Sequence, residues 1–111
     1  MNNYKTAFDS LPWTDGATGL RYKEFVKDNK KLRLVEFSDT FVEKEWCEKG
    51  HFGIALEGRT TVLFNNGSKV TYVKGDIINI PHSEHDKHKA FISKGEKAVF
   101  LFFEDVYVRE P

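Results

Sequence analysis

The sequence predicts a single all-β domain, an antiparallel sandwich or barrel, and two observations support this fold class. Apolar runs of strand length recur along the chain, and each ends at turn-forming residues. The chain has 111 residues, the size of one compact domain, and its ten phenylalanines suit the interior of a sheet-built core. We therefore expect one domain over residues 1–111, with an N-terminal arm and the first strands in 1–31 and the barrel core in 32–108.

The expected elements follow the chain in order. A weak helical pattern covers residues 4–11, and Pro12 is expected to end it. The predicted strands are the apolar runs at 32–37, 53–56, 60–64, 70–73, 77–80, 89–92 and 98–103. Between two of these runs, the asparagines and glycine at 65–67 accept positive φ, which predicts a hairpin.

The strand predicted at 98–103 is apolar on both faces, with more apolar residues at 106–108. A barrel interior covers only one face of a strand, and soluble monomers rarely expose a large aromatic patch. We therefore expect a homodimer that covers the second face. The alternative is that the N-terminal segment, with Phe8, Leu11 and Trp13, folds back over its own sheet.

Charge and composition exclude several classes of partner. The 17 lysines and arginines balance 17 acidic residues, which leaves no basic excess for a nucleic acid. The first residues contain no apolar leader, and no run approaches the roughly 20 apolar residues of a membrane span. The single cysteine cannot form an internal disulfide, and a free thiol suits a reducing compartment. We expect a cytoplasmic protein that binds neither nucleic acid nor membranes.

Residues 45–58 resemble the first of the two motifs that characterise the cupin superfamily. Gly58 ends the segment Ile-Ala-Leu-Glu-Gly, which is similar to a common cupin turn, and it fits the glycine of the motif. Counting back from Gly58, His51 stands where the motif has a glutamate, and Cys47 and Glu45 stand where it has two histidines. The usual set of three histidines and one glutamate is therefore not present, and iron-dependent oxygenase chemistry does not carry over from the resemblance.

The second cupin motif runs from a glycine through a proline to a histidine, and Gly75 and Pro81 fit its first half. Its histidine is His88 or His85; we prefer His88 because the strand predicted at 89–92 follows it. Residues 46–51 (Trp-Cys-Glu-Lys-Gly-His) also resemble a subgroup of small cupins with an Asp-His-Cys-Trp (DHCW) signature. The resemblance covers most of the chain from residue 32 and implies a double-stranded β-helix, the jelly-roll barrel of the cupins.

Three residues at these motif positions form a candidate metal site. Cys47 and His51 are four residues apart, so a regular strand would turn both to one face, although Gly50 between them favours a bend. The resemblance implies that His88 enters from a neighbouring strand. One thiolate and two imidazoles suit zinc, nickel, copper or ferrous iron, and three protein ligands leave positions open for water or substrate.

Other residues near the motifs are weaker candidates for the site. Glu45 has the right parity for a fourth ligand, and His85 is the alternative to His88. Trp46 is a candidate for lining the mouth of a pocket. Cys47 could also form a nucleophilic thiolate–imidazole pair with a histidine, or be a buried cysteine beside hydrogen-bonded histidines with no metal.

The functional prediction is a small metal-binding cupin that takes an unassigned small molecule and uses the metal as a Lewis acid or to activate water or oxygen. The alternative is a non-catalytic module that binds a small organic ligand in an apolar barrel without metal. A purely structural dimer is the third interpretation. Cupins include dioxygenases, isomerases, sugar-binding modules and regulators, so the resemblance does not choose among these activities.

Overall fold

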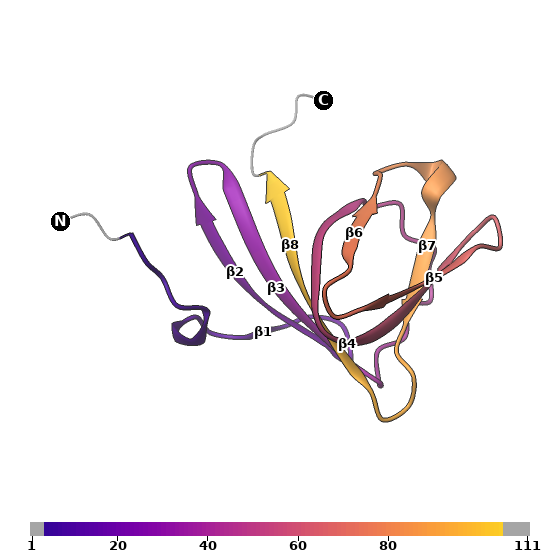
Figure 1. Ribbon diagram of the computed structural model, residues 1–111, viewed down its shortest axis with the longest axis horizontal. Helices are drawn as coiled ribbons and strands as arrows, with labels where there is room; N and C mark the ends of the chain where they lie inside the picture. Colours follow the sequence, from indigo (N-terminus) through magenta and orange to yellow (C-terminus); the bar gives the residue numbers. More distant parts are fainter. Residues whose placement is uncertain (1–3, 106–111) are drawn as a thin grey trace.

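The computed structural model describes residues 4–105 and consists almost entirely of antiparallel strands (Figure 1). The strands, in chain order, are β1 (Thr14–Asp15), β2 (Leu20–Lys27), β3 (Lys30–Ser38), β4 (His51–Phe64), β5 (Lys69–Val73), β6 (Ile77–Ile80), β7 (His88–Phe91) and β8 (Lys97–Asp105). Two short 3-10 helices are present in this part of the chain, η1 (Phe8–Ser10) and η2 (Glu84–Asp86). The all-β prediction is confirmed. Residues 106–108, which the prediction places in the barrel core, lie outside the described residues.

Strand β4 is the element that joins the two halves of the barrel (Figure 1). Its first half pairs with β8 and β6, and through β8 it continues into β3, β2 and β1. Its second half pairs with β5 on one side and β7 on the other. The predicted hairpin at 65–67 is confirmed, because it connects β4 to β5. Because β4 belongs to both sheets, the two sheets can enclose a space between them.

The sequence predicts two strands, 53–56 and 60–64, where the structure has one, so this prediction is wrong. The Glu57–Gly58 step is not a turn, since both residues pair with β8; the register shifts between Ala55 and Glu57, which is a bulge within β4 just ahead of this step. Gly58 has a φ of 78°, and a Cβ at this position would overlap the carbonyl of Lys97. The glycine stands where β4 passes from its pairing with β8, which ends at Gly58, to its pairing with β5, which begins at Arg59.

The core lies between the two sheets and follows the period-two alternation of the strands. Its buried side chains are Val35, Ala55, Val62, Tyr72, Ile78, Ile80, Ile92, Ala98, Phe100 and Phe102. On β8, Phe100 and Phe102 point inward with stacked rings, whereas Phe103 is 46% exposed on the outer face. The expectation that the strand at 98–103 is buried on both sides is therefore not met at Phe103 within this chain.

The helix predicted at residues 4–11 is reduced to the single turn η1, because Leu11 is already extended ahead of Pro12. The segment lies along the outer face of β2, where Lys23 Nζ donates a hydrogen bond to the Phe8 carbonyl at 2.9 Å. Trp13 contacts the same strand, with the Arg21 guanidinium 4.0 Å from its ring centroid. No helix in residues 4–105 is long and apolar enough to cross a membrane.

Candidate metal centre

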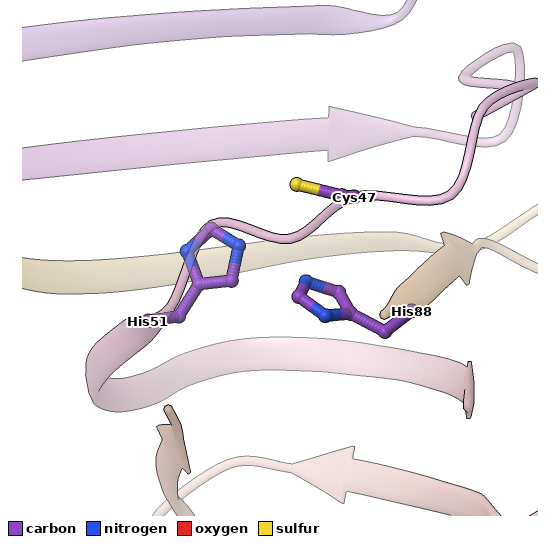
Figure 2. Close-up of side chains that lie close together, drawn as sticks. All are labelled: Cys47, His51 and His88. Atoms are coloured by element: carbon purple, nitrogen blue, oxygen red, sulfur yellow. The ribbon is translucent and has the colours of Figure 1, made fainter. Parts of the chain in front are cut away.

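Cys47, His51 and His88 meet inside the barrel, and Figure 2 shows their side chains turned toward one another. One potential ligand atom from each residue lies within 4.8 Å of the others. His51 is the first residue of β4, and His88 is the first residue of β7. The sequence brings these three residues to one site through three different segments of chain.

The backbone fixes Cys47 directly beside His88. The Cys47 N–H donates to the His88 carbonyl at 2.9 Å, and the His88 N–H donates to the Cys47 carbonyl at 3.0 Å. Between Cys47 and His51 the chain passes close to the end of β6 at Gly50, where a Cβ would lie 2.5 Å from the Ile80 carbonyl oxygen. Glycine at this position therefore lets the chain carry both side chains to the same cavity.

His88 is arranged as a ligand through its Nε2 atom. The side chain is buried, with 3% of its surface exposed. Its Nδ1 lies 2.9 Å from the carbonyl oxygen of Asp86, and because a carbonyl only accepts, Nδ1 carries the proton. The Nε2 lone pair is then free, yet Nε2 has no hydrogen-bond partner within residues 4–105. A buried polar atom without a partner costs about 1–3 kcal/mol, and a metal ion at Nε2 would remove that cost.

His51 is held neutral by its surroundings. Burial lowers its pKa to about 4, and the neighbouring His88 adds to the effect. A metal binds the neutral imidazole, so this histidine needs to lose no proton at pH 7. Its ring packs between His88 and Phe102, with centroid distances of 5.3 and 4.9 Å. These contacts fix the orientation of the ring before any ligand binds.

The three residues line a cavity of about 160 Å³ between the sheets. Most of its wall is apolar and comes from the inner faces of both sheets: Leu20, Val35, Phe37, Phe41, Val62, Ile78, Ile80, Ala90, Phe100 and Phe102. The polar side chains that share the wall with the candidate ligands are Arg33, Glu43, Lys49 and Thr60. A metal at the three donors would therefore face a small, mainly apolar space.

The remaining candidates from the sequence lie elsewhere. His85 is exposed on η2, so the structure favours His88 as the inward histidine. Glu45 is exposed, because the chain bends at this residue and the strand parity that would turn it inward is lost. Trp46 is also exposed, with Lys89 Nζ 4.9 Å from its ring centroid, and it does not line the cavity. Its neighbour Cys47 is the residue that faces this cavity.

The sequence analysis missed four polar residues of the cavity, Arg33, Glu43, Lys49 and Thr60. Glu43 lies four residues before Cys47, the same spacing as Cys47 to His51, and its Oε1 accepts a hydrogen bond from the Ala90 N–H at 2.7 Å. Arg33 shares the inner face of β3 with Val35, and Thr60 shares that of β4 with Val62. Period-two alternation along each predicted strand could have placed Arg33 and Thr60 there.

The donor set fits a metal ion. Thiolate sulfur and two imidazole nitrogens are the ligands found at zinc and other borderline-soft transition metals, and one of the nitrogens lacks any other partner within the described chain. The same proximity of a thiol to two imidazoles would also serve a cysteine nucleophile. The site can therefore bind a cation or activate Cys47.

Comparison with known proteins identifies the fold. No protein-family model matches the chain, and no curated protein matches it either. A sugar phosphate isomerase of the cupin superfamily from Silicibacter pomeroyi superposes with a TM-score of 0.75 at 17% identity, over 93% of this chain and 76% of that one. The polyketide cyclase RemF from Streptomyces resistomycificus also gives 0.75 at 17% identity, over 98% of this chain and 89% of its own. A structure of FeII HppE gives a TM-score of 0.64 at 17% identity, over 88% of this chain and 57% of that one. The chain has the cupin fold, a single-domain β-barrel.

Proposed function

We propose that this cupin-fold protein binds one divalent transition metal through Cys47, His51 and His88, and that a small molecule binds beside the metal. The observation that carries the proposal is His88, buried with its Nδ1 proton given to the Asp86 carbonyl and its Nε2 aimed at two other ligand-type side chains. An orphaned imidazole nitrogen beside a thiol and a second, neutral imidazole is the arrangement that a metal ion completes.

A bound metal would supply Lewis acidity and lower the pKa of a bound water. The chain's own residues hold the ligands in place: the Asp86 carbonyl sets the tautomer of His88, and Phe102 packs against the ring of His51. Apolar side chains form most of the wall beside these ligands. Zinc, nickel, copper and iron all suit the donors; the Fe(II) structure of HppE supports iron, and the thiolate supports zinc or copper. The site would be an active site if the cavity binds a substrate that reacts at the metal.

Metal analysis of six proteins tests the site. Wild type, purified without chelator, should contain close to one transition-metal ion per chain, and Cys47→Ala, His51→Ala and His88→Ala should each lose it. His82→Ala and His85→Ala are matched controls, because both histidines are exposed, and they should keep the metal. Full metal content in the three site variants would refute the assignment.

The second candidate is a metal-free module that binds a small organic ligand, and the apolar wall of the cavity favours it. Wild-type protein with no metal, even after dialysis against zinc, nickel, copper and ferrous salts, would favour this candidate. A reactive Cys47 would instead show itself by stoichiometric labelling with iodoacetamide that His88→Ala slows.

We also propose that the protein belongs with the DHCW cupins, on the basis of residues 46–51. We propose that it resides in the cytoplasm, where a free Cys47 stays reduced. Finally, we propose that it forms a homodimer. The support for the dimer is the outer face of β4 and β8, where Phe52 is 60% exposed and lies 6.2 Å, centroid to centroid, from Phe103.

A further inference from the structure

A cluster of charged side chains lies where the cavity opens to solvent. Arg33 and Lys49 line the cavity, and the Lys49 side chain is 49% exposed, so its charge lies at the opening. Lys31 and Glu104 are register partners on β3 and β8. They share the inner face of these strands with Arg33, two residues after Lys31, and so extend the charged cluster outward. The mouth of the cavity is therefore charged, whereas its interior is mainly apolar.

Glu104 is the partner that the three cations of the mouth share. Its carboxylate oxygens lie 3.5 Å from Lys31 Nζ, 3.5 Å from Lys49 Nζ and 3.9 Å from Arg33 Nη1. Glu24 pairs with two of the same cations, at 3.5 Å from Lys31 and 3.6 Å from Arg33. Burial alone would raise the pKa of Glu104, but the three cations outweigh it and hold the pKa below its ordinary value of 4.5. Glu104 is therefore ionised at neutral pH and neutralises the cations around it.

The other polar groups of the wall are balanced or closed. The Glu43 carboxylate accepts a hydrogen bond from the Ala90 N–H at 2.7 Å. With Glu24 and Glu104 it sets three carboxylates against the three cations. The Thr60 hydroxyl lies in the wall but is closed to water. Apart from the candidate metal ligands, the wall and the mouth therefore carry no net charge.

The size and the lining of the space limit the ligand. A cavity of about 160 Å³ is close to one that holds a benzene molecule, so the ligand has roughly six to nine non-hydrogen atoms. Four phenylalanines stand among the apolar side chains of the wall: Phe37, Phe41, Phe100 and Phe102. A charged ligand would lose its hydration in this space without meeting an unpaired counter-charge, and that loss is far more costly than burying a neutral polar group.

We propose that the wall of the cavity selects an uncharged small molecule with an apolar body, and that Glu104 sets this preference by neutralising the cations at the mouth. Glu104 is a specificity-determining residue that acts through Arg33 and Lys49, since it does not itself line the cavity. This inference rests on the proposed function for the choice of cavity, and it names the class of ligand.

The test compares molecules of one size and different charge. One series is benzyl alcohol, benzoate and benzylamine, and the second is 3-methylbutan-1-ol, 3-methylbutanoate and 3-methylbutylamine. Binding is followed by NMR titration of chelator-treated protein at neutral pH, because a carboxylate or an amine can also bind a metal directly. In each series the wild type should bind the alcohol about tenfold more tightly than the acid or the amine.

Glu104→Gln should change this preference in a fixed direction. The variant leaves three cations against two carboxylates, so the affinity for the acids should rise about tenfold and that for the amines should fall. The affinity for the alcohols should stay within about twofold, because they carry no charge. Glu57→Gln is the matched control. It removes the same charge from an exposed ion pair with Lys97, away from the cavity, and should keep the wild-type order.

A wild type that binds none of the six molecules, or binds an acid or an amine as tightly as its alcohol, would overturn the inference, and this comparison needs no variant to fold. An affinity for acids that Glu104→Gln leaves unchanged would overturn the role of Glu104. Metal analysis of the untreated wild type separates this inference from the proposed metal site. Alcohol preference in a protein without metal would refute only the metal site, and full metal content without alcohol preference would refute only the ligand class.

Discussion

Protonation of His51 should make the metal-free protein lose stability as the pH falls from 6.5 toward 4. Burial lowers the pKa of His51 from its ordinary value of 6.5 to about 4 in the folded protein. Between these values the unfolded chain binds a proton that the folded chain does not, so lowering the pH favours unfolding. The full difference corresponds to about 3 kcal/mol, of which about 2 kcal/mol is already lost at pH 5. Above pH 6.5 this contribution is constant.

The assay is urea denaturation of chelator-treated protein at pH 7.5, 6, 5 and 4.5, and the perturbation is His51→Gln. The variant should show a flatter dependence of unfolding free energy on pH, by about 2 kcal/mol between pH 7.5 and 5. His85→Gln, on exposed η2, should keep the wild-type slope. Glu104, whose pKa lies below its ordinary value of 4.5, contributes only at the acid end and cancels in the comparison. Equal slopes in wild type and His51→Gln would refute the reasoning.

Two further predictions concern the metal and the bend in β4. A chelator at pH 8 should lower the melting temperature, because the metal binds only the folded protein, and an unchanged melting curve would count against a tight site. Protonation of His51 should weaken metal binding only as the pH approaches its pKa of about 4. Gly58→Ala should destabilise the fold by more than 1 kcal/mol, on the order of the cost of a strained positive φ plus a clash, since its Cβ would overlap the Lys97 carbonyl. Gly67→Ala is the matched control: φ is also positive there, at 93°, but no atom lies within 4 Å, so the unfolding midpoint in urea should shift less.

The motif positions were sufficient to predict which residues meet at the site. Cys47, His51 and His88 come together because the first two lie on the stretch that leads into β4 and the third begins β7, and these are the stretches that fit the two motifs. The choice of His88 over His85 followed from the strand after it, which the structure contains as β7. The resemblance to the two cupin motifs carries this information, so a single sequence was enough.

The rest of the cavity depends on contacts that are distant in sequence. Arg33 faces the site because β3 pairs with β8 in a register that sets it opposite Phe102, and no local pattern determines that register. Glu43 lies in a segment without regular strand structure, where period-two alternation does not apply. The same irregularity turned Glu45 and Trp46 outward. The sequence predicts two strands in place of β4 because Glu57-Gly58 fits a turn, whereas the structure keeps both residues paired with β8 and gives Gly58 a positive φ within the strand.

The outer face of β4 and β8 leads to the last prediction, that the protein is a homodimer and that Phe103→Asp dissociates it. Phe52 and Phe103 form an exposed aromatic pair, 6.2 Å between ring centroids, that the N-terminal segment leaves uncovered. Fully burying an exposed phenylalanine side chain is worth about 1.5–3 kcal/mol. Phe52 and Phe103 are 60% and 46% exposed, so a two-fold interface that covers two such pairs gains about twice that amount. An aspartate at its centre would be a buried, unpaired charge.

Light scattering at about 50 µM, a concentration chosen above the micromolar dissociation constants of modest interfaces, measures the mass. Wild type should give twice the 12.9 kDa of one chain, and Phe103→Asp should give one chain. Phe91→Asp is the matched control, because Phe91 is 45% exposed on β7, in the other sheet, and it should remain dimeric. A wild type with the mass of one chain would refute the homodimer. A Phe103→Asp variant that is folded and still dimeric would show that the interface lies on another face.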